Sequence, residues 1–188
     1  MPDHITTYTG QWFYPTQPDP EAIHIEDIAH ALPMICRGNG HVKKFFSVGE
    51  HCILCAREAQ ARGYSDRVVL ACLLHDASEC YMSDVPRPFK KMLPEYIESE
   101  NRLLDLIYEK YLGSPLTDGE QKQLKGIDDD LLWYDLKYLL NEECGPQPEV
   151  HVRSSYEWIP FERVTEEYLA IFREYSSRLA RMRDTDSE

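Results

Sequence analysis

The sequence has no long hydrophobic run and no basic leader. Its longest unbroken apolar stretch is the seven residues of Val68–Leu74, whereas a membrane-spanning helix needs roughly 20. The first fifteen residues lack both the basic start and the apolar stretch of a secretory signal. We therefore expect no membrane-spanning segment, no membrane partner and, by default, a cytoplasmic protein.

Positive charge is also scarce. Lys and Arg number 20 against 33 Asp and Glu, which gives a formal net charge of −13. Because proteins that bind DNA or RNA present a basic face to the phosphates, we expect no nucleic-acid polymer as a partner. Two short segments, 36–47 and 84–94, nevertheless hold six of the basic residues against one acid, Asp84. This local charge predicts a site for a small phosphate ester.

Cysteine pairs suited to a metal are nearly absent. Six cysteines are present, and we expect them to be reduced in a chain without an export signal. Only Cys52 and Cys55 have the spacing of a zinc knuckle, and a four-cysteine site would need a second such pair. We therefore interpret them as buried thiols.

Strand-like alternation and internal repeats are missing as well, while apolar residues recur at helical spacing. We predict an all-α fold forming one domain over 1–188, with an irregular lead-in over 1–24, a core over about 25–142 and a segment at 150–159 that could form a short hairpin. Helices are expected over 25–36 with a kink or stop at Pro33, 47–62, from 65 or 66 through 74, 95–112, 117–142 and 165–183.

The residues with the clearest chemical signal are His75 and Asp76, which directly follow the apolar run. His51 lies on the preceding helix and three aspartates, Asp128–Asp130, lie on a later one. Two imidazoles and two carboxylates from three helices can surround one divalent cation. Each signal alone is weak, since a single histidine on an apolar face is usually a core residue. The order and spacing carry the prediction.

This order resembles that of the HD-domain superfamily of metal-dependent phosphohydrolases. Ser47–His51, His75–Glu79 and Ser83–Pro88 are similar to segments of the bacterial 5′-deoxynucleotidases, and 27–30 and 37–41 to phage-type HD phosphohydrolases. The resemblance covers roughly 25–140. It implies an HD-domain helical bundle, a nucleotide as small-molecule substrate, hydrolysis of deoxynucleoside 5′-monophosphates to deoxynucleoside and phosphate, and a homodimer.

The resemblance also implies the metal ligands His51, His75, Asp76 and one aspartate of the triplet. Relatives have a pattern similar to Ala-Asp-x-x-Leu-Leu, which aligns with Ile127–Leu132 and selects Asp128, although a shift by one residue would select its neighbour. The implied cofactor is one divalent transition metal, Mn²⁺, Co²⁺, Fe²⁺ or Zn²⁺. A single ion is favoured because no histidine lies between His75 and Asp128.

Further roles follow from the same resemblance. If the third helix continues, Glu79 shares a face with His75 and Asp76, and it is implied as the general acid/base. The resemblance further implies Arg37 for binding phosphate and Asp84 for contact with the deoxyribose. Independently of the resemblance, we expect His41 to line the substrate pocket and Lys43 to add positive potential there.

Three alternatives stay open. Some phage-type relatives hydrolyse deoxynucleoside triphosphates, and release of pyrophosphate or triphosphate instead of phosphate would distinguish them. A non-catalytic nucleotide-binding module on the same scaffold predicts a degraded ligand set, whereas all four positions are filled here. If the resemblance misleads, the chain is an all-α interaction protein.

Overall fold

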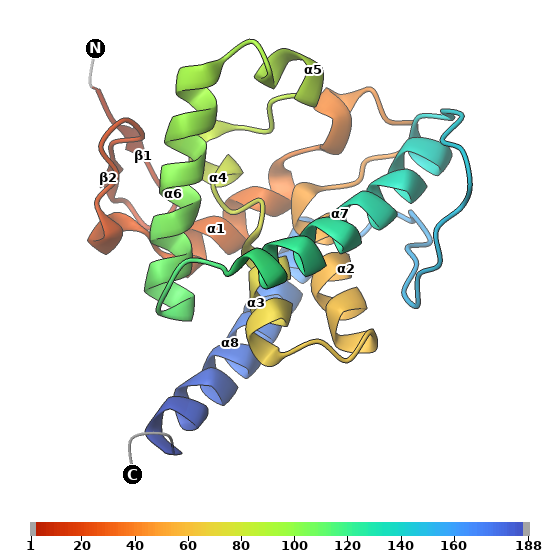
Figure 1. The fold of residues 1–188 in the computed structure, drawn as a ribbon. Coiled ribbons are helices and arrows are strands. Elements are labelled where there is room, and N and C mark those ends of the chain that lie inside the picture. Colours follow the sequence, from red (N-terminus) through yellow and green to blue (C-terminus); the bar gives the residue numbers. More distant parts are fainter. Residues whose placement is uncertain (1–2, 186–188) are drawn as a thin grey trace.

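The computed structural model describes the backbone of residues 3–185 and the side chains of residues 3–183. Helices dominate the fold (Figure 1). They are α1 (Ile25–Ala31), α2 (Val48–Ala61), α3 (Asp66–Leu74), α4 (Glu79–Met82), α5 (Arg87–Lys90), α6 (Pro94–Leu112), α7 (Asp118–Leu139) and α8 (Phe161–Thr185). The predicted all-α class is confirmed.

Two short strands form the one sheet of the described residues. β1 (Ile5–Thr6) and β2 (Trp12–Phe13) pair antiparallel, with Ile5 opposite Phe13. The hairpin therefore lies in the lead-in and not at 150–159, which has no regular structure. There the backbone N–H groups of His151 and Val152 donate to the Glu58 carboxylate at 2.8 and 2.9 Å, so they are not free for strand pairing.

The apolar run Val68–Leu74 forms most of α3 and is entirely buried. Contacts place α3 between α2 and α8, and α7 crosses α2 and α3 on the side away from α8 (Figure 1). The Tyr168 hydroxyl of α8 donates to the Leu73 carbonyl oxygen at 2.6 Å. Helix α3 is thus held by α2 and by α8 immediately before His75.

Helix α2 begins where the sequence predicts. Ser47 and Glu50 form a capping box in which each side chain accepts from the other's backbone N–H group. Thr117 and Glu120 do the same at the start of α7. These two helices deliver the first histidine and the aspartate triplet.

The end of α3 differs from the expected continuation through Glu79. The helix stops at Leu74, His75–Ser78 form a turn, and α4 starts afresh at Glu79. The His75 imidazole Nδ1 lies 2.8 Å from the Cys72 carbonyl oxygen. Because a side chain binds this carbonyl at the helix end, it acts as a cap there. Among the described residues, no helix is both long and apolar enough to cross a membrane.

Candidate metal centre

Three elements bring two imidazoles and two carboxylates together. His51 lies in the first turn of α2, His75 and Asp76 follow α3, and Asp128 lies on α7. His51 Nε2 is 3.2 Å from Asp128 Oδ1, and His75 Nε2 is 3.2 Å from Asp76 Oδ2 and 3.9 Å from Asp128 Oδ1. The two imidazole ring centroids are 5.4 Å apart. Residues spread over 78 positions of the sequence thus meet in one cluster.

Of the three adjacent aspartates, Asp128 is the one that faces the histidines. Its side chain is 14% exposed, and while its Oδ2 pairs with Arg87 at 2.8 Å and Lys125 at 3.5 Å, its Oδ1 faces His51. The side chain of Asp129 is 51% exposed and pairs with Lys125. Asp130 accepts from Arg62 at 2.8 Å. Of the three aspartates, Asp128 is thus the one with a carboxylate oxygen 3.2 Å from His51.

The protonation of His75 suits it to hold a metal. Its Nδ1 faces the Cys72 carbonyl oxygen at 2.8 Å, and since a carbonyl only accepts, Nδ1 carries the proton. The other nitrogen, Nε2, is buried and has no hydrogen-bond partner among the described residues. It lies 3.2 Å from Asp76 Oδ2 and 3.9 Å from Asp128 Oδ1, where a metal ion can replace the proton that the two carboxylates favour on this nitrogen. The residues present fit a divalent metal.

The site contains a carboxylate that sequence reasoning missed. Asp135 Oδ2 lies 3.2 Å from His51 Nδ1 and 3.5 Å from Arg37, and Asp135 Oδ1 accepts from the Tyr156 hydroxyl at 3.0 Å. A signal was available, because seven residues are two helical turns and place Asp135 on the same face as Asp128. The carboxylate beside Nδ1 leaves Nε2 of His51 free for the cluster.

Arg37 joins the two halves of the site. Its guanidinium lies 3.4 Å from Asp76 and 3.5 Å from Asp135. Burial is the largest single effect and would lower its pKa, but Asp135 and Asp76, with the more distant Glu79 and Asp128, together raise it. Burial is likewise the largest single effect on His75 and would lower its pKa, but Asp76, Cys52 and Cys55 together raise it well above the usual range. In the absence of a metal, the negative charge of the carboxylates is balanced by the Arg37 guanidinium and by protons on the histidines.

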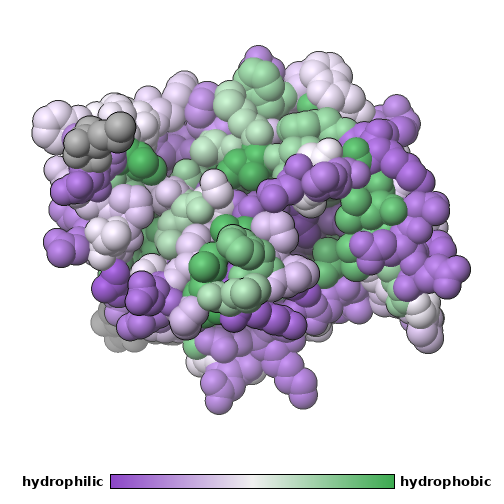
Figure 2. Space-filling model, turned by 90° about the horizontal axis from the view of Figure 1, so that it is seen from above, coloured by the Kyte–Doolittle hydropathy of each residue, from purple (hydrophilic) through white to green (hydrophobic). Residues whose placement is uncertain are grey.

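A cavity of about 600 Å³ opens at this cluster, within the size range of small-molecule sites. Its polar lining residues are Arg37, Asp76, Glu79, Asp84, Arg87, Lys90, Asp128, Asp135 and Glu142. Its apolar walls include Val42, Val85, Pro86, Leu132, Leu136, Leu139 and Leu140. Seen from above, the molecule gathers hydrophobic side chains in the middle of its face and hydrophilic ones around the edge (Figure 2).

Two predicted substrate-binding residues do not line this cavity. His41 and Lys43 are both exposed and are absent from its walls. They follow a tight turn in which Gly38 and Asn39 have left-handed backbone conformations, and the Lys43 backbone N–H donates to the Leu139 carbonyl oxygen at 2.9 Å. Arg37, at the start of the turn, does reach the cavity.

Glu79 lies in the cavity wall with an unusual environment for a carboxyl group. It is 6% exposed, and its Oε2 has no hydrogen-bond partner among the described residues. Burial raises its pKa well above the usual range, and the charges of Asp76 and Asp84 raise it further. The pKa of Asp84 is also raised, chiefly by burial. A carboxyl with a raised pKa beside a charged cluster is typical of a proton donor.

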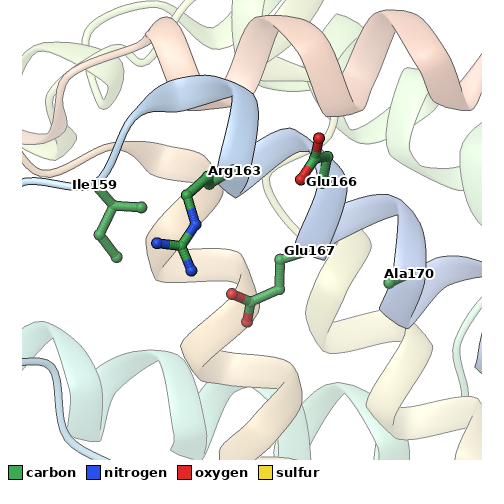
Figure 3. Close-up of a pocket in the computed structure, with 5 residues that line it drawn as sticks. All are labelled: Ile159, Arg163, Glu166, Glu167 and Ala170. Atoms are coloured by element: carbon green, nitrogen blue, oxygen red, sulfur yellow. The ribbon is translucent and has the colours of Figure 1, made fainter.

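A second hollow lies beside the start of helix α8, apart from the metal-site cavity (Figure 3). It is lined by Ile159, Arg163, Glu166, Glu167 and Ala170. Arg163 and Glu167 extend from the same side of the helix in this view, and Glu167 pairs with Arg57. The lining has neither imidazole nor thiol, so it offers no donor set like that of the central cluster.

Comparison with known proteins identifies relatives of this chain. It is 32% identical over 140 residues to the protein YfdR of Escherichia coli K12, an alignment that covers 69% of this chain and 76% of YfdR. It is 38% identical over 100 residues to RCAP_rcc00048 of Rhodobacter capsulatus, half of each chain. Both are described as uncharacterized proteins, so neither name brings an activity. No family model matches the sequence.

Proposed function

The chain belongs to the same family as YfdR of Escherichia coli, and we propose that it is a metal-dependent phosphohydrolase of the HD-domain superfamily. One observation carries this proposal. The unpartnered, buried His75 Nε2 faces the carboxylates of Asp76 and Asp128, and both of these residues line a cavity together with Arg37. A cation site beside a phosphate-binding group suits phosphate-ester hydrolysis.

His51, His75, Asp76 and Asp128 would hold the metal. A divalent transition metal bound there supplies Lewis acidity toward phosphate and acidifies water. The protein orients two of these ligands from outside, since His75 Nδ1 is held by the Cys72 carbonyl and His51 Nδ1 lies beside Asp135. Such outer partners fix the ring orientation and raise the basicity of the ligating nitrogen.

The proposed substrate is a deoxynucleoside 5′-monophosphate, and the products are deoxynucleoside and phosphate. Arg37 would bind the phosphate oxygens through its planar guanidinium. Asp84 lies in the cavity wall on the segment stiffened by Pro86 and Pro88, where it would leave no room for a 2′-hydroxyl. The leucines of α7 offer an apolar wall for the base.

Glu79 is the proposed general acid/base. Its carboxyl lines the same cavity and its raised pKa keeps it protonated at a pH where an exposed glutamate is ionised. It can therefore give a proton to the departing 5′ oxygen. No covalent nucleophile is required.

The function is tested by supplying deoxy- and ribonucleotides, from mono- to triphosphates, with Mn²⁺, Co²⁺, Fe²⁺ or Zn²⁺ in turn. We expect release of inorganic phosphate from deoxynucleoside monophosphates and much slower release from ribonucleotides. Release of pyrophosphate or triphosphate would instead identify a triphosphate hydrolase. Absence of turnover with any nucleotide and metal would contradict the proposal.

Asp135→Asn should weaken metal binding without unfolding the protein. Asparagine keeps the size of the side chain but removes the negative charge beside His51 Nδ1. Loss of such an outer partner typically costs 10–100-fold in metal affinity, and we expect a loss of about that size in competition with a chromophoric chelator. Asp129→Asn, on the exposed side of α7, is the matched control. Equal affinity of both variants would contradict the role of Asp135.

A further inference from the structure

We propose that Cys55 is a further ligand of the metal and that the centre binds its ion through a thiolate as well as through nitrogen and oxygen. This inference rests on the proposed metal centre and extends its donor set. The sequence offered no second cysteine pair to complete a zinc site with Cys52 and Cys55, and the fold supplies histidines in its place.

The position of Cys55 carries the inference. It lies one helical turn after His51 on α2, and its Sγ is 3.5 Å from His51 Nε2, the nitrogen that also faces Asp128. One donor atom from each of His51, Cys55 and His75 lies within 4.8 Å of the others, and all three residues are buried. The unpartnered Nε2 of His75 is a separate sign that this space is built for a cation.

The distances match a metal's requirements. A Zn–N bond of about 2.0 Å and a Zn–S bond of about 2.3 Å at a tetrahedral angle place nitrogen and sulfur about 3.5 Å apart. The observed separation of Cys55 Sγ from His51 Nε2 is 3.5 Å. On the other side of the same nitrogen, Asp128 Oδ1 lies at 3.2 Å, close to the edge expected between two light donors. Both distances measured from His51 Nε2 are therefore those expected between ligand atoms of one ion.

Cys52 provides the contrast. It is also buried, and its Sγ lies 3.9 Å from His75, but from Nδ1. That nitrogen is already directed at the Cys72 carbonyl oxygen at 2.8 Å, so it is not free to share an ion with Cys52. One donor atom of Cys52 also lies within 4.8 Å of donor atoms of His75 and Asp76, but its Sγ faces the capped Nδ1 of His75, whereas Cys55 faces the His51 nitrogen that also faces Asp128. Cys55 is therefore the proposed ligand, and Cys52 is its control.

A thiolate ligand narrows the choice of metal. Sulfur favours Zn²⁺, Co²⁺ and Fe²⁺ over the harder Mn²⁺ and Mg²⁺. On binding, the Cys55 S–H bond breaks, its proton goes to the solvent, and a sulfur–metal bond forms with no change of oxidation state. The centre should therefore prefer zinc to manganese by more than its nitrogen and oxygen ligands alone would produce.

The experiment uses the purified full chain, stripped with a chelator and reloaded with one equivalent of Co²⁺. A thiolate ligand gives an intense near-ultraviolet sulfur-to-cobalt charge-transfer band, while the weaker visible bands report cobalt binding of any kind. We expect the charge-transfer band in the wild type and in Cys52→Ser, and its loss in Cys55→Ser with the visible bands retained. Zinc affinity of Cys55→Ser should fall at least about tenfold, and manganese affinity much less.

The outcomes separate this inference from the proposed function. If the wild type shows visible cobalt bands but no charge-transfer band, or if Cys55→Ser keeps that band, Cys55 is not a ligand and the phosphohydrolase proposal stands. If the wild type binds no cobalt, both fail. Cys55→Ala, scored by circular dichroism for folding, replaces the serine variant should the latter be unstable, and it must lose the same band.

Discussion

His75→Ala is expected to abolish metal binding and nucleotide hydrolysis together. The substitution removes the nitrogen that lies within 4 Å of both Asp76 and Asp128, and the two carboxylates then repel each other without a group between them. A catalytic metal supplies several kcal/mol of transition-state stabilisation, and each 1.36 kcal/mol is a factor of ten in rate. Turnover should therefore fall by roughly a thousandfold or more.

The measurement for His75→Ala pairs metal content, determined on the purified protein, with initial rates of phosphate release. His30→Ala is the control, because His30 stacks on Tyr8 away from the cluster; it should keep both metal and rate. Full activity of the His75 variant would show that the proposed metal centre takes no part in the reaction. Loss of fold is monitored by circular dichroism, and Asp76→Asn offers a second route to the same result.

Glu79→Gln is expected to keep the metal and lose the rate. The amide preserves the shape of the side chain but cannot donate or accept the proton, and a general acid/base contributes typically 10²–10⁴-fold. We expect a loss of that size in kcat, with metal content unchanged. Glu95→Gln, on the exposed first turn of α6, is the control and should behave as the wild type. A Glu79 variant that turns over at full rate would exclude the proposed role.

The pH dependence gives Glu79 a separate test. Burial, with Asp76 and Asp84 nearby, raises the pKa of this carboxyl in the folded state. The acid form is therefore lost as pH rises through that raised pKa, and kcat should decline there in the wild type but not in Glu79→Gln. The same shift destabilises the metal-free fold at higher pH, because the unfolded chain releases the proton more easily. Metal-free Glu79→Gln should then melt at a higher temperature than the metal-free wild type above neutral pH.

Much of the fold could be predicted because local signals dictate it. The capping boxes at Ser47 and Thr117 mark the starts of α2 and α7, and Pro33 ends the first helix as expected, since α1 stops at Ala31 and a short 3₁₀ turn follows. These features depend on neighbours within four residues. The apolar run of α3 likewise predicts a buried helix.

The differences arise where tertiary contacts override local pattern. The end of α3 is set by the His75 side chain on a backbone carbonyl, and 150–159 is held by the distant Glu58 carboxylate. Neither contact is visible as a spacing in the sequence. The hairpin at Ile5–Phe13 joins two strands of only two residues each. Such strands are too short for apolar and polar residues to alternate recognisably in the sequence.

The candidate site divides in the same way. The motif order brings His51, His75, Asp76 and Asp128 into consideration, and the fold places them within a few ångströms of one another. The roles of Asp135 and Cys55 could be assigned only from the structure, because they depend on which imidazole nitrogen each side chain faces. His41 and Lys43 were chosen from charge and proximity along the chain, and the turn at Gly38 carries them outside the cavity lining.

The most direct test of the account is phosphate release from deoxynucleoside 5′-monophosphates by one preparation measured three times: as purified, after removal of metal by a chelator, and after addition of one equivalent of Zn²⁺ or Co²⁺. If the metal centre is required for hydrolysis, release stops on chelation and returns with the metal. Release that continues unchanged in the metal-free protein, or that never appears with any metal, would contradict it.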